Sequence, residues 1–171
     1  MSVRIEIRVA GEEDGPLLAE LGARAFAEAF PTTDPDDLAL HIAHEYSLEA
    51  IAAELAAPGS RSFIADVGAE PVGYAFLQKD VHEAVAGANP IELNRIYVLQ
   101  EWVGAGVGDA LMERCLAEAR AAGCDTIWLG TWDQNARAIR FYERWDFEKV
   151  GTQTFRLGND LQSDIVMARP V

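Results

Sequence analysis

The stretch VGAGVGDALM, residues 103–112, places three glycines at alternate positions directly before an apolar run with helical character. Glycine loses more freedom on folding than any other residue, which costs roughly 0.5–1 kcal/mol relative to alanine inside a helix or strand. Three glycines are therefore expected where a ligand must approach the backbone closely. A tight turn from a strand into a helix is the structural alternative.

Two familiar phosphate-binding motifs do not match this stretch. A P-loop has Lys and then Ser or Thr after its last glycine, whereas Gly108 is followed by Asp109 and Ala110. The dinucleotide motif G-x-G-x-x-G would need a glycine at position 109 and would open the first strand–helix–strand unit of the chain. What remains is a glycine loop at a helix N-terminus, where unpaired N–H groups can bind an anion without a lysine.

The sequence on both sides of the loop predicts an α/β sandwich with a mixed sheet, in one domain over residues 1–171. Asp34 and Ser47 are expected to cap two of the helices, and Gly123 to end the helix that follows the loop. The patterns predict strands at 3–9, 61–67, 71–78, 91–99, 126–132, 148–157 and 163–171, and helices at 12–30, from 35, 47–57, 106–122 and 135–145.

The chain is strongly acidic, with 28 Asp and Glu against 14 Lys and Arg and a net charge of −14. Such a surface repels nucleic acids and favours cationic small molecules or basic peptides. Solubility alone is the alternative explanation. An anionic ligand would have to be held by local dipoles and arginines.

Several classes of protein are excluded or disfavoured by composition. Cys115 and Cys124 are too few for a disulfide scaffold and are predicted to be buried or half-buried thiols. No apolar run approaches the roughly 20 residues of a membrane span. Residues 3–9 alternate as a strand does rather than as a signal peptide. We therefore expect a cytoplasmic protein with no membrane or nucleic-acid partner.

Two motifs in this order resemble the GNAT superfamily of acetyl-CoA-dependent N-acetyltransferases, over roughly residues 4–169. The phosphate loop of that superfamily reads Q/R-x-x-G-x-G/A, and Val103, Gly106 and Gly108 stand at those positions. Its later N-x-x-A-x-x-F-Y signature is matched from Asn135 to Tyr142. The resemblance implies the GNAT fold, a central mixed, mostly antiparallel sheet of about seven strands flanked by helices, with acetyl-CoA as co-substrate and no metal.

Further segments are similar to the PaiA-type spermidine/spermine acetyltransferases, among them ELNRIYVL (92–99), IWLGTWDQN (127–135) and GNDLQSDIVM (158–167). This similarity implies acetylation of a primary amine on a polyamine, a polycation that suits the acidic chain. Two alternatives remain open. One is acetylation of a peptide N-terminus or lysine, and the other is an acyl-CoA-binding sensor without turnover. The sequence leaves a monomer and a homodimer equally open.

The resemblance also implies which residues bind coenzyme A. Backbone groups on the strand before the loop would bind the pantetheine arm and polarise the acetyl carbonyl. Asn135 would bind pantetheine amides or cap its helix, and Arg140 would contact the phosphates or face solvent. The implied cofactor-binding set is Ile96, Tyr97, Val98, Val103, Gly104, Ala105, Gly106, Val107, Gly108, Asn135, Arg137 and Tyr142.

Two departures from the pattern affect this loop. Val103 replaces the usual Gln or Arg, so its side chain cannot help to bind phosphate. Asp109 places a carboxylate in the first helical turn, where it either caps nearby amides and points away or weakens the phosphate site. We expect a somewhat lower cofactor affinity, not its loss.

Acetyl transfer requires a neutral amine, yet an alkyl ammonium has a pKa of about 10.4, so neutrality at pH 7 costs roughly 4–5 kcal/mol. Glu92 is the candidate general base, directly or through water, with pairing to Arg95 or attraction of the cation as the alternative. Tyr142 is the candidate acid that protonates the leaving thiolate. Its alternative role is that of a core tyrosine beside Phe141.

The candidates for the acceptor pocket are aromatic residues, which also suit a core. Aromatic rings favour the methylenes and the charge of a polyamine. The candidates are Phe26, Phe30, Tyr46 and Trp132. His41 and His44 lie three residues apart but lack a third ligand and an HExxH pattern, so no metal site is predicted.

Overall fold

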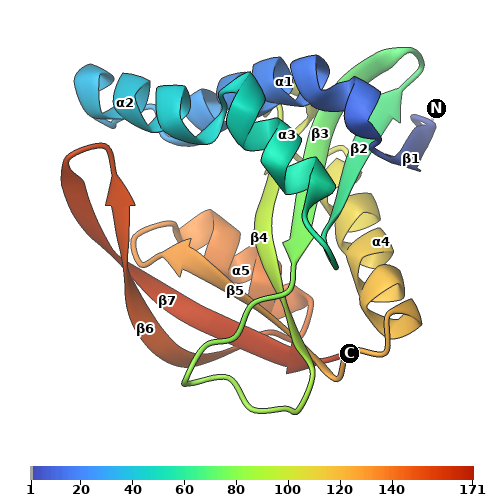
Figure 1. Ribbon diagram of the computed structural model, residues 1–171, viewed down its shortest axis with the longest axis vertical. Coiled ribbons are helices and arrows are strands. Elements are labelled where there is room, and N and C mark those ends of the chain that lie inside the picture. Colours follow the sequence, from blue (N-terminus) through green and yellow to red (C-terminus); the bar gives the residue numbers. More distant parts are fainter. Residues whose placement is uncertain (1) are drawn as a thin grey trace.

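The structure is a computed structural model that describes residues 2–171. Its seven strands form one sheet in the order β1-β2-β3-β4-β5-β7-β6 (Figure 1). The strands are β1 (Ile5–Val9), β2 (Arg61–Val67), β3 (Glu70–Gln78), β4 (Pro90–Val98), β5 (Thr126–Trp132), β6 (Glu148–Leu157) and β7 (Asp160–Pro170). The helices are α1 (Gly15–Ala29), α2 (Pro35–Glu45), α3 (Leu48–Ala56), α4 (Val107–Ala121) and α5 (Ala136–Arg144), with 3-10 turns η1 (Glu12–Asp14) and η2 (Gln100–Trp102).

The β4–β5 pairing shapes the middle of the sheet. These two strands run parallel, and every other neighbouring pair is antiparallel, which confirms the mixed, mostly antiparallel sheet. Only Pro90–Glu92 of β4 pairs with Thr126–Trp128 of β5, and beyond that point the two strands diverge (Figure 1). A bulge in β4 at Asn94, where its register with β3 shifts, accompanies the divergence. The sheet is therefore split at its centre.

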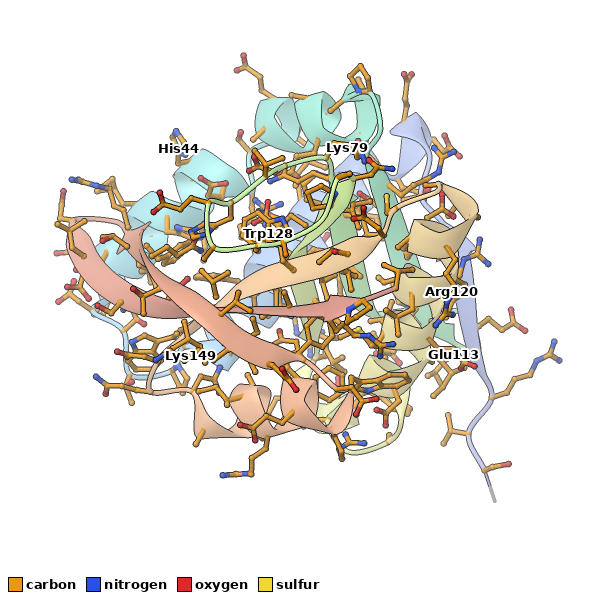
Figure 2. All side chains as sticks on the ribbon, turned by 90° about the horizontal axis from the view of Figure 1, so that it is seen from below. His44, Lys79, Glu113, Arg120, Trp128 and Lys149 are labelled. Atoms are coloured by element: carbon orange, nitrogen blue, oxygen red, sulfur yellow. The ribbon has the colours of Figure 1, made fainter. Side chains whose placement is uncertain are left out.

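Helices cover both faces of the sheet, as Figure 2 shows from below. Helices α1, α2 and α3 pack on one face around Leu18, Phe26 and Ile51, together with Tyr74 of β3. Helices α4 and α5 pack on the other face, and their core includes Leu111. Each apolar helix stripe is thus buried against the sheet, as a layered α/β arrangement requires.

The local helix signals are confirmed at three positions. The Asp34 carboxylate accepts hydrogen bonds from the N–H groups of Asp36 and Asp37, and the Ser47 hydroxyl accepts one from Ala50. Gly123 follows α4 with φ +74°. The predicted 12–30 helix differs at its start, because residues 12–14 form the 3-10 turn η1 before α1 begins at Gly15.

The remaining sequence-level expectations concern thiols and membranes. Cys115 and Cys124 are both buried free thiols, as predicted, and burial raises the pKa of Cys115 above its ordinary value. None of the helices in the described part of the chain is long and apolar enough to cross a membrane.

Candidate active site

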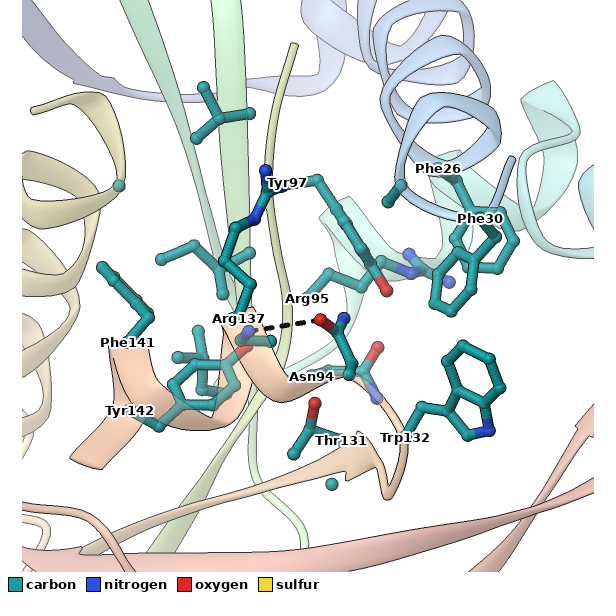
Figure 3. A pocket seen from close by; sticks show the side chains of 18 of the residues that line it. Phe26, Phe30, Asn94, Arg95, Tyr97, Thr131, Trp132, Arg137, Phe141 and Tyr142 are labelled. Carbon is teal, nitrogen blue, oxygen red and sulfur yellow. Dashed lines mark hydrogen bonds between the residues drawn. The ribbon is translucent and has the colours of Figure 1, made fainter. Parts of the chain in front are cut away.

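A cavity of about 840 Å³ opens where β4 and β5 diverge (Figure 3). It runs from the glycine loop at the start of α4, along β4, to the face of the sheet covered by α1 and α2. The volume lies within the range of pockets that bind drug-sized ligands. The split in the sheet therefore accompanies a cavity large enough for such a ligand.

The glycine loop lies at one end of this cavity. Gly104 and Gly106 have φ values of +85° and +92°, a left-handed conformation that only glycine adopts without strain. Gly106 is the N-cap of α4, and no side chain caps the helix. The first N–H groups of a helix have no partner within it, so those of α4 are available to an anion. This loop has the free amides that binding a pyrophosphate requires.

Not every residue of the loop faces the cavity. Val103, Gly104, Gly106 and Gly108 line it, whereas the Val107 side chain is only 1% exposed and belongs to the core. Ala105 is absent from the lining. A β-carbon at Gly108 would lie 3.4 Å from Cε2 of Phe141 in α5. Gly108 therefore lies within van der Waals range of Phe141 where α4 meets α5, a contact that the sequence did not indicate.

The structure answers the question raised by Asp109. Its Oδ1 accepts a hydrogen bond from Nε1 of Trp145 at 2.8 Å and one from Nη1 of Arg144 at 3.3 Å. The carboxylate is thus engaged with the end of α5 rather than capping the loop amides. It links the helix after the glycine loop to the helix that carries Tyr142.

Helix α5 contributes two arginine side chains and its N-cap residue to the same cavity. Arg137 and Arg140 both line it, and neither forms an ion pair with any of residues 2–171. The Asn135 side chain accepts a hydrogen bond from the Ala138 N–H at 3.2 Å, marked by the dashed line in Figure 3. Asn135 is therefore an N-cap, and its side-chain amide N–H groups remain available to a ligand.

Strand β4 supplies an open edge of backbone. Ile96, Tyr97 and Val98 line the cavity and pair with β3 on one side, while their β5 side has no strand partner. Unpaired backbone N–H and C=O groups of this kind bind an extended chain such as a pantetheine arm.

Tyr142 is both a core residue and a cavity residue. It is 9% exposed, and its ring packs edge-on against Phe141 and Phe147. Burial raises the pKa of Tyr142 above its ordinary value of 10.0, so the phenol keeps its proton at neutral pH. The two roles that the sequence offered for this residue are compatible.

Glu92 lies at the point where the strands diverge and is 7% exposed. Its carboxylate accepts hydrogen bonds from Gln78 Nε2 at 2.6 Å and Asn94 Nδ2 at 3.2 Å. Burial raises the pKa of Glu92, which these two hydrogen bonds oppose. Pairing with Arg95, the alternative role considered for Glu92, does not occur.

Arg95 instead joins two helices to the sheet. Its guanidinium donates to Glu54 Oε1 of α3 at 2.5 Å and to Glu45 Oε2 of α2 at 3.0 Å. Arg95 thus pairs with Glu45 and Glu54, and Glu92 takes its hydrogen bonds from Gln78 and Asn94. Arg95 also lies over the Tyr46 ring, 4.9 Å from its centroid.

Three of the four predicted aromatic residues line the acceptor end of the cavity: Phe26, Phe30 and Trp132. Tyr46 does not. Its hydroxyl is 2.6 Å from the Tyr74 hydroxyl within the core, because the missing side chain of Gly22 leaves room for the Tyr46 ring.

The two histidines considered as metal ligands have different surroundings. His41 lines the cavity and stacks on Phe26 with centroids 4.3 Å apart, and burial lowers its pKa. His44 is exposed and contacts Glu45. Among residues 2–171, no group of three or more His, Cys, Asp or Glu side chains is arranged to hold a metal ion.

Several cavity residues had no signal in the sequence. Asn94 and Thr131 border the divergence point (Figure 3), and Gln153, Phe155, Gln162 and Asp164 come from the β6–β7 hairpin. Their spacing follows no motif, because strand pairing brings them together over long sequence separations. Asp164 is an acid within an alternating strand pattern, but such acids occur in many core strands and do not mark a site.

The comparison with protein families decides the classification. A model of the acetyltransferase (GNAT) family matches residues 18–147. The chain belongs to this family. It is therefore an acyltransferase, and the GNAT fold expected from the two sequence motifs is confirmed.

Individual proteins are similar over nearly the whole chain. An uncharacterised N-acetyltransferase of Mycobacterium bovis is 34% identical over 157 residues, which cover 91% of this chain and 97% of that protein. The PaiA N-acetyltransferase of Thermoplasma acidophilum, solved with coenzyme A, matches at a TM-score of 0.77 and 19% identity, covering 98% and 99% of the two chains. The ribosomal-protein-S18-alanine N-acetyltransferase of Escherichia coli matches at a TM-score of 0.73 and 21% identity, covering 98% of this chain and 94% of that chain.

Proposed function

We propose that residues 1–171 act as a single N-acetyltransferase domain that transfers an acetyl group from acetyl-CoA to a primary amine of a small cationic acceptor, most readily a di- or polyamine. One observation carries the proposal: the cavity joins an uncapped helix N-terminus at one end to buried carboxylates and aromatic rings at the other. An anionic donor and a cationic acceptor therefore have separate entrances that meet between β4 and β5.

Acetyl-CoA is the acetyl donor, and it supplies the acetyl group as an activated thioester. The amides at the start of α4 bind its pyrophosphate, with Arg137 and Arg140 nearby. The open edge of β4 holds the pantetheine arm. Because Val103 cannot donate to a phosphate and Asp109 is engaged with α5, backbone amides and arginines carry the phosphate binding.

Glu92 and Tyr142 serve the proton transfers. Glu92 accepts a proton from the acceptor ammonium, directly or through water, and its raised pKa makes it a better base than an exposed carboxylate. The Tyr142 phenol stays protonated at neutral pH and donates to the departing sulfur. A backbone N–H of Ile96, Tyr97 or Val98 polarises the acetyl carbonyl.

The acceptor class follows from charge and from shape. The net charge of −14 attracts polycations, and aromatic rings at the acceptor end suit methylene chains. The sequence similarity to PaiA-type enzymes supports the same class. Acetylation of a peptide N-terminus, the reaction named for the Escherichia coli neighbour, is the competing outcome of the test.

A thiol-release assay with acetyl-CoA and a panel of amines tests this function. The panel contains diamines, polyamines, amino acids, aminoglycosides and basic peptides. We expect release with di- and polyamines and much less with peptides. Selective release with peptides would favour protein acetylation, and binding of acetyl-CoA without release on any amine would favour a sensor.

Binding of the donor is measured separately by thermal denaturation. Acetyl-CoA at 100 times its Kd adds about 2.7 kcal/mol to the free energy of unfolding, so Tm rises by several degrees. An unchanged Tm at millimolar acetyl-CoA would contradict the donor site.

A further inference from the structure

A second buried carboxylate lies in the same cavity as Glu92. Asp164 of β7 is opposite Trp132 of β5 and Gln153 of β6, and it is 6% exposed. Glu92 is opposite Trp128, which lies four residues before Trp132 on β5. Alternate side chains of a strand share a face, so Glu92 and Asp164 both face α1 and α2. The pocket thus contains two acids on its acceptor side.

The two acids lie at different positions along the cavity. Four residues of β5 correspond to about 13 Å at 3.3 Å per residue. Asp164 also lies beyond β5, on the side away from β4. One nitrogen beside Glu92 therefore leaves Asp164 free for a second group.

Asp164 has no counterion in the described part of the chain. None of the Lys, Arg or His side chains in residues 2–171 forms an ion pair with it. Burial raises the pKa of Asp164 to about 6, against a hydrogen bond from Gln153 that lowers it and with a smaller contribution from the nearby Asp133 carboxylate. A buried charge without a partner is costly. A bound cation would offset that cost.

The surroundings of Asp164 offer further acceptors. A β-carbon at Gly130 would collide with Gln153 Nε2 and lie 3.2 Å from Asp164 Oδ2, so the glycine admits both side chains. Gln162 also lines the cavity, and its Oε1 is buried without a hydrogen-bond partner among residues 2–171. An unused amide oxygen and a carboxylate both require a donor, and an ammonium group provides three N–H donors.

We propose that Asp164, together with Gln162, binds a second, non-reacting ammonium group of the acceptor while the first nitrogen reacts beside Glu92. Trp132, opposite Asp164, covers the methylenes next to the second nitrogen, and Phe155, opposite Gln162, lines the cavity beyond it. This inference rests on the proposed function and extends it. It makes Asp164 the residue that selects a diamine over a monoamine and over a peptide N-terminus.

Steady-state kinetics with a matched pair of acceptors tests this role. We compare 1,8-diaminooctane, whose chain is long enough to reach from Glu92 toward Asp164, with n-octylamine for the wild type and for Asp164→Asn. Loss of one partner of a buried charge pair lowers kcat/KM for the diamine by about 30-fold or more, mainly through KM. The kcat/KM for n-octylamine is expected to change little, because the monoamine has no second nitrogen. A diamine preference retained in the variant overturns the proposal.

A second carboxylate variant controls for the loss of one negative charge. Glu148 of β6 is exposed and lies outside the cavity lining, so Glu148→Gln should keep the diamine preference of the wild type. An equal loss on both acceptors in Asp164→Asn also overturns the proposal, since Asp164 would then act on the reacting amine or on the scaffold.

Calorimetric titration of 1,8-diaminooctane into the CoA-bound protein separates this inference from the proposed function. If the wild type binds the diamine and Asp164→Asn binds it at least about 30-fold more weakly, the subsite stands even without turnover. Equal binding by both proteins refutes the subsite, whatever the activity. Absence of diamine binding by the wild type refutes it as well.

Discussion

At the residue scale, Tyr142 combines a structural and a proposed chemical role in one side chain. Its ring packs in the core between Phe141 and Phe147, and Tyr142 also lines the cavity. Removal of the hydroxyl alone keeps the ring in place. The substitution Tyr142→Phe therefore removes the proton donor while it keeps the packing of the ring.

Tyr142→Phe is expected to lower kcat by about 100-fold, the lower end of what a positioned acid contributes. The Kd for acetyl-CoA, measured by calorimetry, should stay within about threefold of the wild type, because the amides and arginines remain. An unchanged kcat would mean that another group protonates the sulfur.

The raised pKa of Asp164 leads to a prediction about stability that can be tested without an activity assay. Its pKa is about 6 in the folded protein against an ordinary value of 3.8, so folding favours the protonated acid. The stability that the acid form contributes is present at pH 4 and is lost as the pH rises through 6. Asp164→Asn should thus match the wild type at pH 4 and have the higher Tm at pH 7. A lower Tm at pH 7 would contradict this.

At the element scale, the N-terminus of α4 and the loop before it form the proposed donor site. The sequence indicated this loop because the signal is local: glycines at positive φ, a strand before them and a helix after them. The N-caps Asp34 and Ser47 were predictable for the same reason, since each bonds to amides two or three residues away. The 3-10 turn η2, between β4 and the loop, had no such signal.

Gly104, in the loop before α4, and Gly123, just after α4, form a matched pair of positions for testing the role of the loop. Gly104 has φ +85° and Gly123 has φ +74°, and a β-carbon at either would meet no atom within 4 Å. Either change to alanine should cost roughly 1–2 kcal/mol of stability through backbone strain. Only Gly104→Ala should also weaken acetyl-CoA binding, by about tenfold, because Gly104 lines the cavity.

Calorimetry of acetyl-CoA binding to the two variants provides the comparison, with urea unfolding as the measure of stability. Gly123→Ala is the matched control, since it has the same strain far from the loop. Equal Kd values for both variants would show that the loop does not hold the donor.

At the scale of the whole molecule, the acceptor end of the cavity is assembled from residues far apart in sequence. Arg95 reaches Glu45 and Glu54, 50 and 41 residues away, and Asp164 meets Gln153 across the β6–β7 pairing. Side-chain periodicity predicts the strands but not their order, so it could not place Asp164 in the same cavity as Glu92. For the same reason Tyr46 was wrongly expected in the pocket, since its core contact with Tyr74 depends on how α2 and α3 pack.

The net charge of −14 also acts through the whole molecule, because it concentrates cations near the surface. Raising the salt concentration from about 20 to about 200 mM screens this field. We expect kcat/KM for 1,4-diaminobutane to fall severalfold while the KM for acetyl-CoA, an anion, does not rise. A diamine kcat/KM that is independent of salt would show that the surface charge does not guide the acceptor.

The most direct test of acetyl transfer to a diamine is mass spectrometry of the products formed from acetyl-CoA and 1,4-diaminobutane. We expect one acetyl group on one nitrogen of the diamine and an equal amount of free CoA, with both products absent when the protein is omitted. Hydrolysis of acetyl-CoA without an acetylated amine, or no consumption of acetyl-CoA at all, would contradict the proposed reaction.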